Sequence, residues 1–131
     1  MTHLFDASSL VDALLTGRVE VTFDQRVLDL TPYEAGNALW KNHHLREEIS
    51  EDRFGQLVAL LAELLGDVHV EPVRDLDLEG TMTLALDESI TFYDAAYVAC
   101  AIREDVTLVT EDRELATVAG RHVEATDLDR L

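Results

Sequence analysis

The chain has 131 residues, 47% of them hydrophobic, which suits one domain (1–131) with a core of its own and leaves no room for a second. Cys100 is its only cysteine, which excludes a disulfide within the chain; its apolar surroundings predict a buried thiol in a reducing compartment. Asp and Glu number 27 against 10 Lys and Arg, a net charge of −17. This charge argues against a basic patch that binds nucleic acid without sequence preference, because phosphates would be repelled.

The acidic residues are spread among apolar segments from end to end, as on a folded domain with an acidic surface. Concentrated salt screens the resulting repulsion, so we expect a salt-loving source. No apolar stretch approaches the roughly 18 residues of a membrane span, and the N-terminus lacks the basic residues of a signal peptide. We therefore expect a cytoplasmic protein that does not engage a membrane.

Strand and helix signals alternate along the chain. Residues 3–5 are a short apolar strand, and the apolar positions of 7–15 recur at helical spacing before Gly17. Residues 19–23 are ambiguous. Thr31 as N-cap and Pro32 at the first helical position predict a helix over 32–44, after a strand at 27–30. Ser50 precedes a second helix over 51–65.

The second half continues the alternation. A strand at 68–73 and a helix over 76–86 lead to a buried helix over 92–103 that is capped by Thr91 and apolar on all sides. Residues 106–109 form a near-continuous apolar strand, typical of a parallel sheet that is covered on both faces. A helix over 114–119 and a last strand at 123–125 complete the chain. Such alternation predicts an α/β domain with a mainly parallel sheet.

Four carboxylates stand at junctions between these elements: Asp6, Glu34, Asp94 and Asp112. Asp6 follows the first strand and Asp112 the strand at 106–109, so both lie at the strand ends where parallel sheets bind ligands. A cluster of four carboxylates would need cations to stay ionised. Because the set holds only oxygen ligands, Mg²⁺ or Mn²⁺ suits it better than Zn²⁺.

A simpler interpretation stays open for each acid. Thr31-x-x-Glu34 has the spacing of a capping box, and Thr91-x-x-Asp94 imitates one. Asp6 and Asp112 would likewise stabilise helix N-termini. Composition and spacing alone therefore permit a metal site without requiring it.

The sequence resembles the PIN-domain family, most closely its small VapC-type toxins, in four segments in order: 4–10 (LFDASSL), 33–39 (YEAGNAL), 92–99 (FYDAAYVA) and 108–115 (LVTEDREL). Each segment alone is a weak signal, but together they cover nearly the whole chain. The resemblance implies a three-layer α/β/α fold with a central, mainly parallel sheet. It also implies a metal-dependent endoribonuclease that hydrolyses RNA phosphodiester bonds and pairs with a small antitoxin.

The resemblance assigns roles residue by residue. Asp6 and Asp94 match the principal metal ligands, and Asp112 and Glu34 complete the catalytic quartet directly or through water. Ser8 and Thr110 match small hydroxyl positions beside the acids. Asn37 and Lys41 follow Glu34 on the same helix face, where Asn37 would reach the edge of the site and Lys41 would meet a phosphate, so these four residues are the candidates for substrate binding. Local turn bonding, helix packing or plain solvation explains these four as well, so both interpretations stay open.

Two other classes of phosphate-handling α/β domain fit the sequence less well. A receiver domain or a haloacid-dehalogenase-type phosphatase would need a late lysine, and Lys41 is the only lysine. A non-catalytic PIN-like interaction module and a housekeeping RNA-processing nuclease remain alternatives to the toxin. The helix over 51–65 has an apolar face widened by Leu60 and Leu64, which predicts an exposed interface and a homodimer.

Overall fold

The fold is built on a five-stranded sheet of order β3-β2-β1-β4-β5, in which all the observed strand pairs are parallel. It comes from a computed structural model that describes residues 2–131. The strands are β1 (His3–Phe5), β2 (Arg26–Leu28), β3 (His69–Glu71), β4 (Thr107–Val109) and β5 (Ala125–Thr126). The longer helices are α1 (Ala7–Thr16), α2 (Thr31–Trp40), α3 (Glu51–Leu65), α4 (Leu78–Glu88), α5 (Phe92–Glu104) and α6 (Arg113–Ala119).

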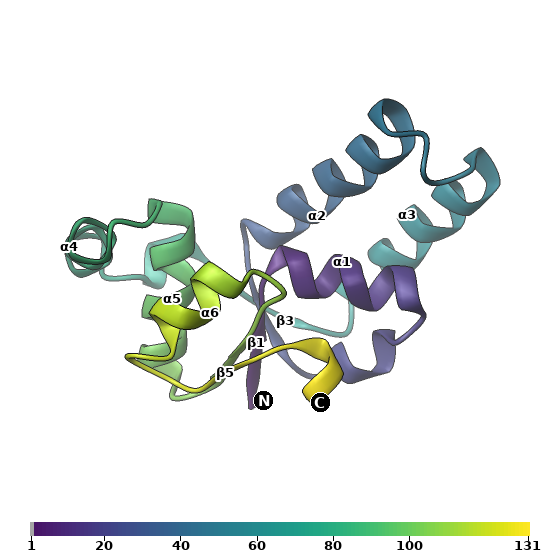
Figure 1. Cartoon of the computed structure of the whole chain (residues 1–131). Helices are drawn as coiled ribbons and strands as arrows, with labels where there is room; N and C mark the ends of the chain where they lie inside the picture. The colour runs from purple at the N-terminus through teal and green to yellow at the C-terminus, as the bar shows by residue number, and fades with distance from the viewer. Residues whose placement is uncertain (1) are drawn as a thin grey trace.

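Helices cover both faces of the sheet, so the predicted three-layer α/β/α arrangement is confirmed (Figure 1). Side chains alternate between the faces along each strand. Leu4, Leu28 and Leu108 face a core that α5 and α6 complete. Phe5 and its neighbours in β2 and β4 face the other way, toward α1, and α1 packs in turn with α2 and α3. The sheet is thus buried on both sides, as its apolar strands require.

The helix that contains Glu34 begins differently from the prediction. Thr31 is its first helical residue, and the preceding Leu30 makes no side-chain cap, so the predicted capping box is wrong. The Thr31 hydroxyl instead accepts from the backbone N–H of Leu28 and bonds the Tyr97 hydroxyl inside the protein. The α-helix also stops at Trp40, and the predicted 32–44 helix continues as the π-helical turn η2 (Lys41–Leu45).

Other predicted elements are present with shifted ends. The ambiguous segment 19–23 contains a 3₁₀ turn, η1 (Val19–Thr22), and a further turn η3 (Val73–Asp75) follows β3. The chain ends in the 3₁₀ turn η4 (Leu128–Arg130). The helix predicted over 76–86 begins two residues later, because Asp77 caps it by accepting from the N–H of Gly80. The last strand pairs at 125–126 instead of 123–125.

Two predictions about burial have opposite outcomes. Cys100 is fully buried as predicted, and burial raises the pKa of its thiol to about 11. Leu64 is also buried, however, and Leu60 is half-buried, so the predicted exposure of Leu64 is wrong because that face of α3 packs against α1 and α2. Val58 is the large apolar side chain of α3 that stays exposed.

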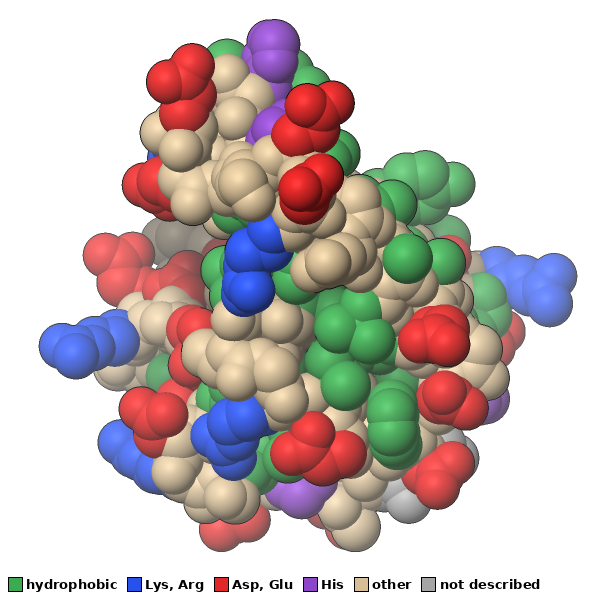
Figure 2. Space-filling view, turned by 90° about the vertical axis from the view of Figure 1, so that its right-hand side faces the viewer, with side chains coloured by type: hydrophobic (Ala, Val, Ile, Leu, Met, Phe, Trp, Pro, Cys, Tyr) green, Lys and Arg blue, Asp and Glu red, His purple; other side chains and the backbone are tan. Residues whose placement is uncertain are grey.

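The acidic surface is visible on the side of the molecule that carries α3 (Figure 2). Red carboxylates are scattered over it, blue cationic side chains are few, and hydrophobic side chains gather near its centre. Within residues 2–131, no helix combines the length and the apolar character that crossing a membrane requires.

One buried ionic cluster joins the β3 edge of the sheet to α5. Glu71, at the end of β3, is only 5% exposed and binds the guanidinium groups of Arg26 from β2 and Arg103 from α5. Glu104 stands 3.4 Å from Arg26 and 3.6 Å from Arg103 and adds a second, weaker counter-charge. Removing one member of a buried ion pair is costly because its partner is left uncompensated.

We expect Glu71→Gln to lower the free energy of unfolding by about 3 kcal/mol, since Arg26 and Arg103 lose their main counter-charge. Urea unfolding at fixed KCl measures the loss. Glu88→Gln is the matched control, because its partner Arg121 is more than half exposed and such surface pairs contribute about 1 kcal/mol or less. Equal losses in the two variants would show that the Glu71 cluster has no special role.

We expect the thermal midpoint to rise as KCl increases from 0.1 M to 1 M. The Debye length then falls from about 10 Å to about 3 Å, which screens the repulsion among acids in a chain of net charge −17. Thermal melts in KCl test this, and sulfate salts are avoided because they strengthen apolar burial by themselves. A midpoint that stays flat across this range would contradict the prediction of salt adaptation.

Candidate active site

The predicted acids meet where the strand order reverses. The connections from β1 and β4, neighbours in the sheet, lead to helices on opposite faces, which opens a crevice at their carboxyl ends. Asp6 follows β1 and Asp112 lies three residues beyond β4. Glu34 enters from the first turn of α2 and Asp94 from the first turn of α5. Four separate elements thus direct one carboxylate each toward this edge.

Asp6 is the most constrained of the four. Its side chain is 5% exposed, and its Oδ1 accepts from the Ser8 hydroxyl at 2.7 Å and from the Ser9 N–H at 2.9 Å. Its Oδ2 accepts from the Thr110 hydroxyl. Burial raises the pKa of Asp6, and these hydrogen bonds partly oppose the increase. Asp6 therefore caps α1, as the simpler interpretation expected, and its charge also raises the pKa values of Glu34 and Asp94.

Ser8 and Thr110 hold this geometry from two sides. The Ser8 hydroxyl donates to Asp6 and accepts from the Glu111 N–H at 3.0 Å. Thr110 donates to Asp6 and accepts from the Asp112 N–H at 3.0 Å, so it connects the end of β1 to the loop after β4. Both hydroxyl protons are engaged within the protein, which makes these residues supports of the acids. Their predicted contact with substrate stays a prediction.

A relay of hydroxyl groups orients Glu34. The Tyr97 hydroxyl donates to Glu34 Oε1 at 2.9 Å and accepts from Thr31 Oγ1 at 2.7 Å, and Thr31 in turn accepts from the Leu28 N–H. Burial is the main cause that raises the pKa of Glu34; the bond from Tyr97 lowers it and the charge of Asp6 raises it. The sequence analysis did not single out Tyr97. It lies one helical turn after Asp94, so it shares a side of α5 with that acid.

Asp94 and Asp112 complete the group. Thr91 caps α5 by accepting from the Asp94 N–H at 3.1 Å, but within residues 2–131 the carboxylate of Asp94 accepts no hydrogen bond. Asp112 caps α6 through Oδ1, which accepts from the N–H groups of Glu114 and Leu115. Burial raises the pKa of Asp94, and the negative charges of Asp112, Asp6 and Glu34 raise it further, in that order.

A groove of about 410 Å³ runs from Glu34 along α2. Ser8, Glu34, Asn37 and Lys41 share its lining, so the structure brings these predicted residues together. Arg46 lines it too, which the sequence analysis missed. The π-turn explains the omission: the Arg46 N–H bonds the Lys41 carbonyl at 3.1 Å, a spacing of five residues that helical periodicity of 3.6 does not reveal.

The donor set of the crevice suits a hard divalent cation. It consists of carboxylate and hydroxyl oxygens. Burial alone raises the pKa of Asp6, whereas burial and neighbouring negative charges together raise the pKa values of Glu34 and Asp94. A cation relieves that repulsion. As the side chains stand, no three His, Cys, Asp or Glu residues among 2–131 are close enough to hold one ion.

Comparison with known proteins adds independent information. The chain is 32% identical over 124 residues to Ribonuclease VapC1 of Mycobacterium tuberculosis, covering 88% of this chain and 89% of the relative. Over 89 residues, 68% of this chain, it is 39% identical to Ribonuclease VapC3 and 37% identical to Exonuclease VapC9, both of Pyrobaculum aerophilum. It spans 66% and 62% of the length of these last two proteins, less than two thirds of each.

Solved structures agree with the sequence relatives. The crystal structure of PAE2754 from Pyrobaculum aerophilum aligns with a TM-score of 0.81 and 30% identity, covering 99% of this chain and 85% of the other. No family model matches the chain. The VapC1 match extends over nearly the full length of both proteins at 32% identity, and the parallel α/β/α architecture is shared with a solved structure. The chain therefore belongs to the VapC-type family of PIN-domain proteins.

Proposed function

We propose that the protein is a metal-dependent endoribonuclease that acts as the toxin of a toxin–antitoxin pair. The observation that carries the proposal is that four elements direct one carboxylate each toward the switch point of a parallel sheet, where the charges of Asp112, Asp6 and Glu34 raise the pKa of Asp94. Relatives named ribonucleases support the same class of reaction. The substrate is RNA, and the cofactor is Mg²⁺ or Mn²⁺.

The residues of the chain have distinct tasks in this proposal. Asp6 and Asp94 are the main metal ligands: Asp6 is fixed by its hydrogen bonds, whereas Asp94 is free to turn toward an ion. Tyr97 donates to Glu34, which favours the ionised carboxylate against the larger opposing effect of burial. Asp112 keeps Oδ2 available because its cap uses Oδ1. When bound, the metal supplies a water of lowered pKa and neutralises charge on the phosphate.

The groove along α2 is the proposed path of the RNA backbone. Asn37 offers an amide to phosphate or ribose oxygens, and Lys41 offers a cation seven residues beyond Glu34. Arg46 adds a second cation on the same groove, held by a bond from Nη1 to Asn42 Oδ1 at 3.2 Å. In a chain of net charge −17, these two cations are valuable because other carboxylates repel phosphate.

A small antitoxin and a second copy of the chain are the proposed protein partners. Both need apolar surface that the single chain leaves uncovered. Such surface lies on α3 at Val58, and on α4 Leu78, Met82 and Leu86 are exposed at helical spacing along one face. The homodimer predicted from α3 therefore has a smaller α3 contact than expected, because Leu64 is buried.

We expect cleavage of single-stranded RNA to stop in excess EDTA and to return when Mg²⁺ or Mn²⁺ is added. The carboxylate oxygens cannot activate water at neutral pH by themselves as a bound divalent ion does. Denaturing gels of a labelled oligonucleotide, run at fixed high KCl, provide the measurement. Cleavage that persists in chelator would exclude the proposed metal mechanism, and no cleavage under any of these conditions would favour a non-catalytic module.

We expect Asp94→Asn to abolish cleavage and, without metal, to raise the thermal midpoint at pH 7. The pKa of Asp94 is higher in the folded protein than in the unfolded chain. The protonated Asp94 carboxyl therefore contributes its full stability below about pH 4, and this contribution is lost as pH rises through the raised pKa. Asn cannot ionise, so the advantage of the variant grows from pH 4 to pH 7. A gain of about 1 kcal/mol corresponds to about 4 °C.

Added metal should reverse the order of the two thermal midpoints, so that wild type melts higher than Asp94→Asn. Wild type gains about 2.7 kcal/mol at an ion concentration a hundredfold above its Kd, whereas the variant lacks a main ligand and gains less. Asp52→Asn is the matched control, since Asp52 also lies in the first turn of a helix but is exposed on α3. It should melt slightly lower with and without metal. If Asp94→Asn behaves like the control, Asp94 acts as a helix-terminal charge only.

A further inference from the structure

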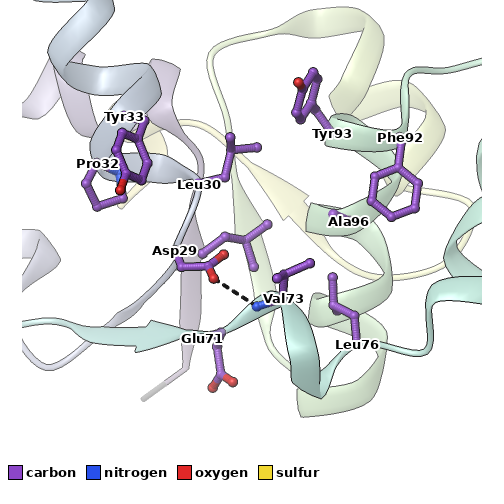
Figure 3. A pocket seen from close by; sticks show the side chains of 11 residues that line it. Asp29, Leu30, Pro32, Tyr33, Glu71, Val73, Leu76, Phe92, Tyr93 and Ala96 are labelled. Carbon is purple, nitrogen blue, oxygen red and sulfur yellow. Dashed lines mark hydrogen bonds between the residues drawn. The ribbon is translucent and has the colours of Figure 1, made fainter.

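A second cavity, of about 590 Å³, lies beside the acids and is not used by the proposed mechanism. Its walls are mostly apolar and come from α2, α5 and the segments after β2 and β3, with Leu30, Pro32, Val73, Leu76 and Phe92 among them (Figure 3). The volume is within the range of small-molecule sites. The position of this uncovered apolar cavity, beside Glu34 and Asp94, indicates which part of a substrate it would bind.

The cavity adjoins the proposed active site through two pairs of neighbouring residues. Tyr33 precedes Glu34 on α2, and Tyr93 precedes Asp94 on α5, so each acid has a tyrosine beside it in the cavity wall. Figure 3 shows the two rings on different elements, with Tyr33 to the left of Leu30 and Tyr93 to its right. A nucleotide whose phosphate lies at the acids would therefore reach this cavity with its base.

Both rings are open to solvent. Tyr33 is 80% exposed and Tyr93 is 59% exposed, although aromatic side chains tend to be buried when a fold can bury them. Exposed aromatic rings bind unpaired bases by stacking, which requires no positive charge on the protein. Stacking also survives the salt that weakens phosphate contacts. A base thus suits this acidic protein better than an additional phosphate would.

One polar group faces this apolar cavity from its edge. Asp29, after β2, is half-buried, and its Oδ2 accepts from the Val73 N–H at 3.0 Å (Figure 3). Its Oδ1 accepts no hydrogen bond from residues 2–131. Carboxylates accept from exocyclic amino groups of bases and repel phosphate. The carboxylate of Glu71, also at the cavity, is engaged by Arg26 and Arg103.

We propose that this cavity binds one unpaired base of the RNA substrate, which stacks on Tyr33 and Tyr93 and donates an exocyclic amino group to Asp29. The inference rests on the proposed ribonuclease function and extends it to the recognition of a nucleotide beside the cleaved bond. It predicts a preference for cytosine over uracil, because cytosine carries an amino group where uracil carries a carbonyl oxygen.

The first test is the steady-state cleavage of a short unstructured RNA with Mn²⁺ at fixed high KCl. Tyr33→Ala and Tyr93→Ala should each raise KM about tenfold, equal to 1.4 kcal/mol, and leave kcat within about twofold. Tyr→Phe at either position should restore the wild-type KM, since the ring is kept. Phe23→Ala is the control, because it also removes an aromatic ring that is 42% exposed but lies outside the cavity.

The second test measures the preference of the cavity for cytosine over uracil. Oligouridine with a single cytosine placed at each position in turn should show one position at which wild type has about fivefold lower KM. Asp29→Asn should invert this preference: the Asn carbonyl keeps the bond to Val73 and its NH₂ then donates to uracil O4. A thermal midpoint close to that of wild type confirms that the variant folds.

The outcomes separate this proposal from the proposed function. If wild type cleaves RNA but the tyrosine and Asp29 variants keep its KM and its base preference, the cavity binds no base and an apolar side chain of a protein partner becomes its occupant. If wild type cleaves no RNA, fluorescence anisotropy with the same oligonucleotides decides. Weaker binding by the tyrosine variants then still supports the cavity, and equal binding overturns it.

Discussion

The site depends on the way in which Asp6 is held at the end of β1. A carboxylate that is only 5% exposed would be costly if its oxygens lacked donors, and here Ser8, the Ser9 N–H and Thr110 supply them. The same bonds connect three parts of the fold: the central strand β1, the start of α1 and the end of β4. Losing this carboxylate would therefore loosen the crevice and the helix together.

The arrangement of acids that suits a metal site lowers the stability of the protein without metal. Asp94 has its pKa raised by burial and by three neighbouring acids, so the protein without metal carries a repulsion that a purely structural arrangement would avoid. The caps of α1 and α6 keep Asp6 and Asp112 in place despite it. The helix-cap and metal-ligand interpretations of these acids are thus compatible, because a carboxylate has two oxygens and the caps leave capacity on each side chain.

The charge of the chain shapes how RNA would be held. A net charge of −17 leaves few cations for phosphates, and two of them, Lys41 and Arg46, meet on one groove through the π-turn. Beside Glu34 and Asp94, a mostly apolar cavity that carries two exposed tyrosine rings offers stacking contacts that salt does not screen. In the proposed complex, the groove would bind the RNA backbone and the cavity would bind a base; Glu34 lines the groove, and the two tyrosines of the cavity precede Glu34 and Asp94.

The sequence by itself determined the elements and the acids. Periodicity and turn residues located each of the longer helices and strands within a few residues, and the four motif segments singled out Asp6, Glu34, Asp94 and Asp112 as candidate ligands, because these signals are local. Only the tertiary structure decided what depends on distant neighbours. Thr31 left its expected cap because Tyr97, 66 residues away, offered a buried partner, and Leu64 became buried because α1 and α2 pack on α3. The π-turn and the Tyr33–Tyr93 cavity likewise arise from packing between separate segments, which no local pattern encodes.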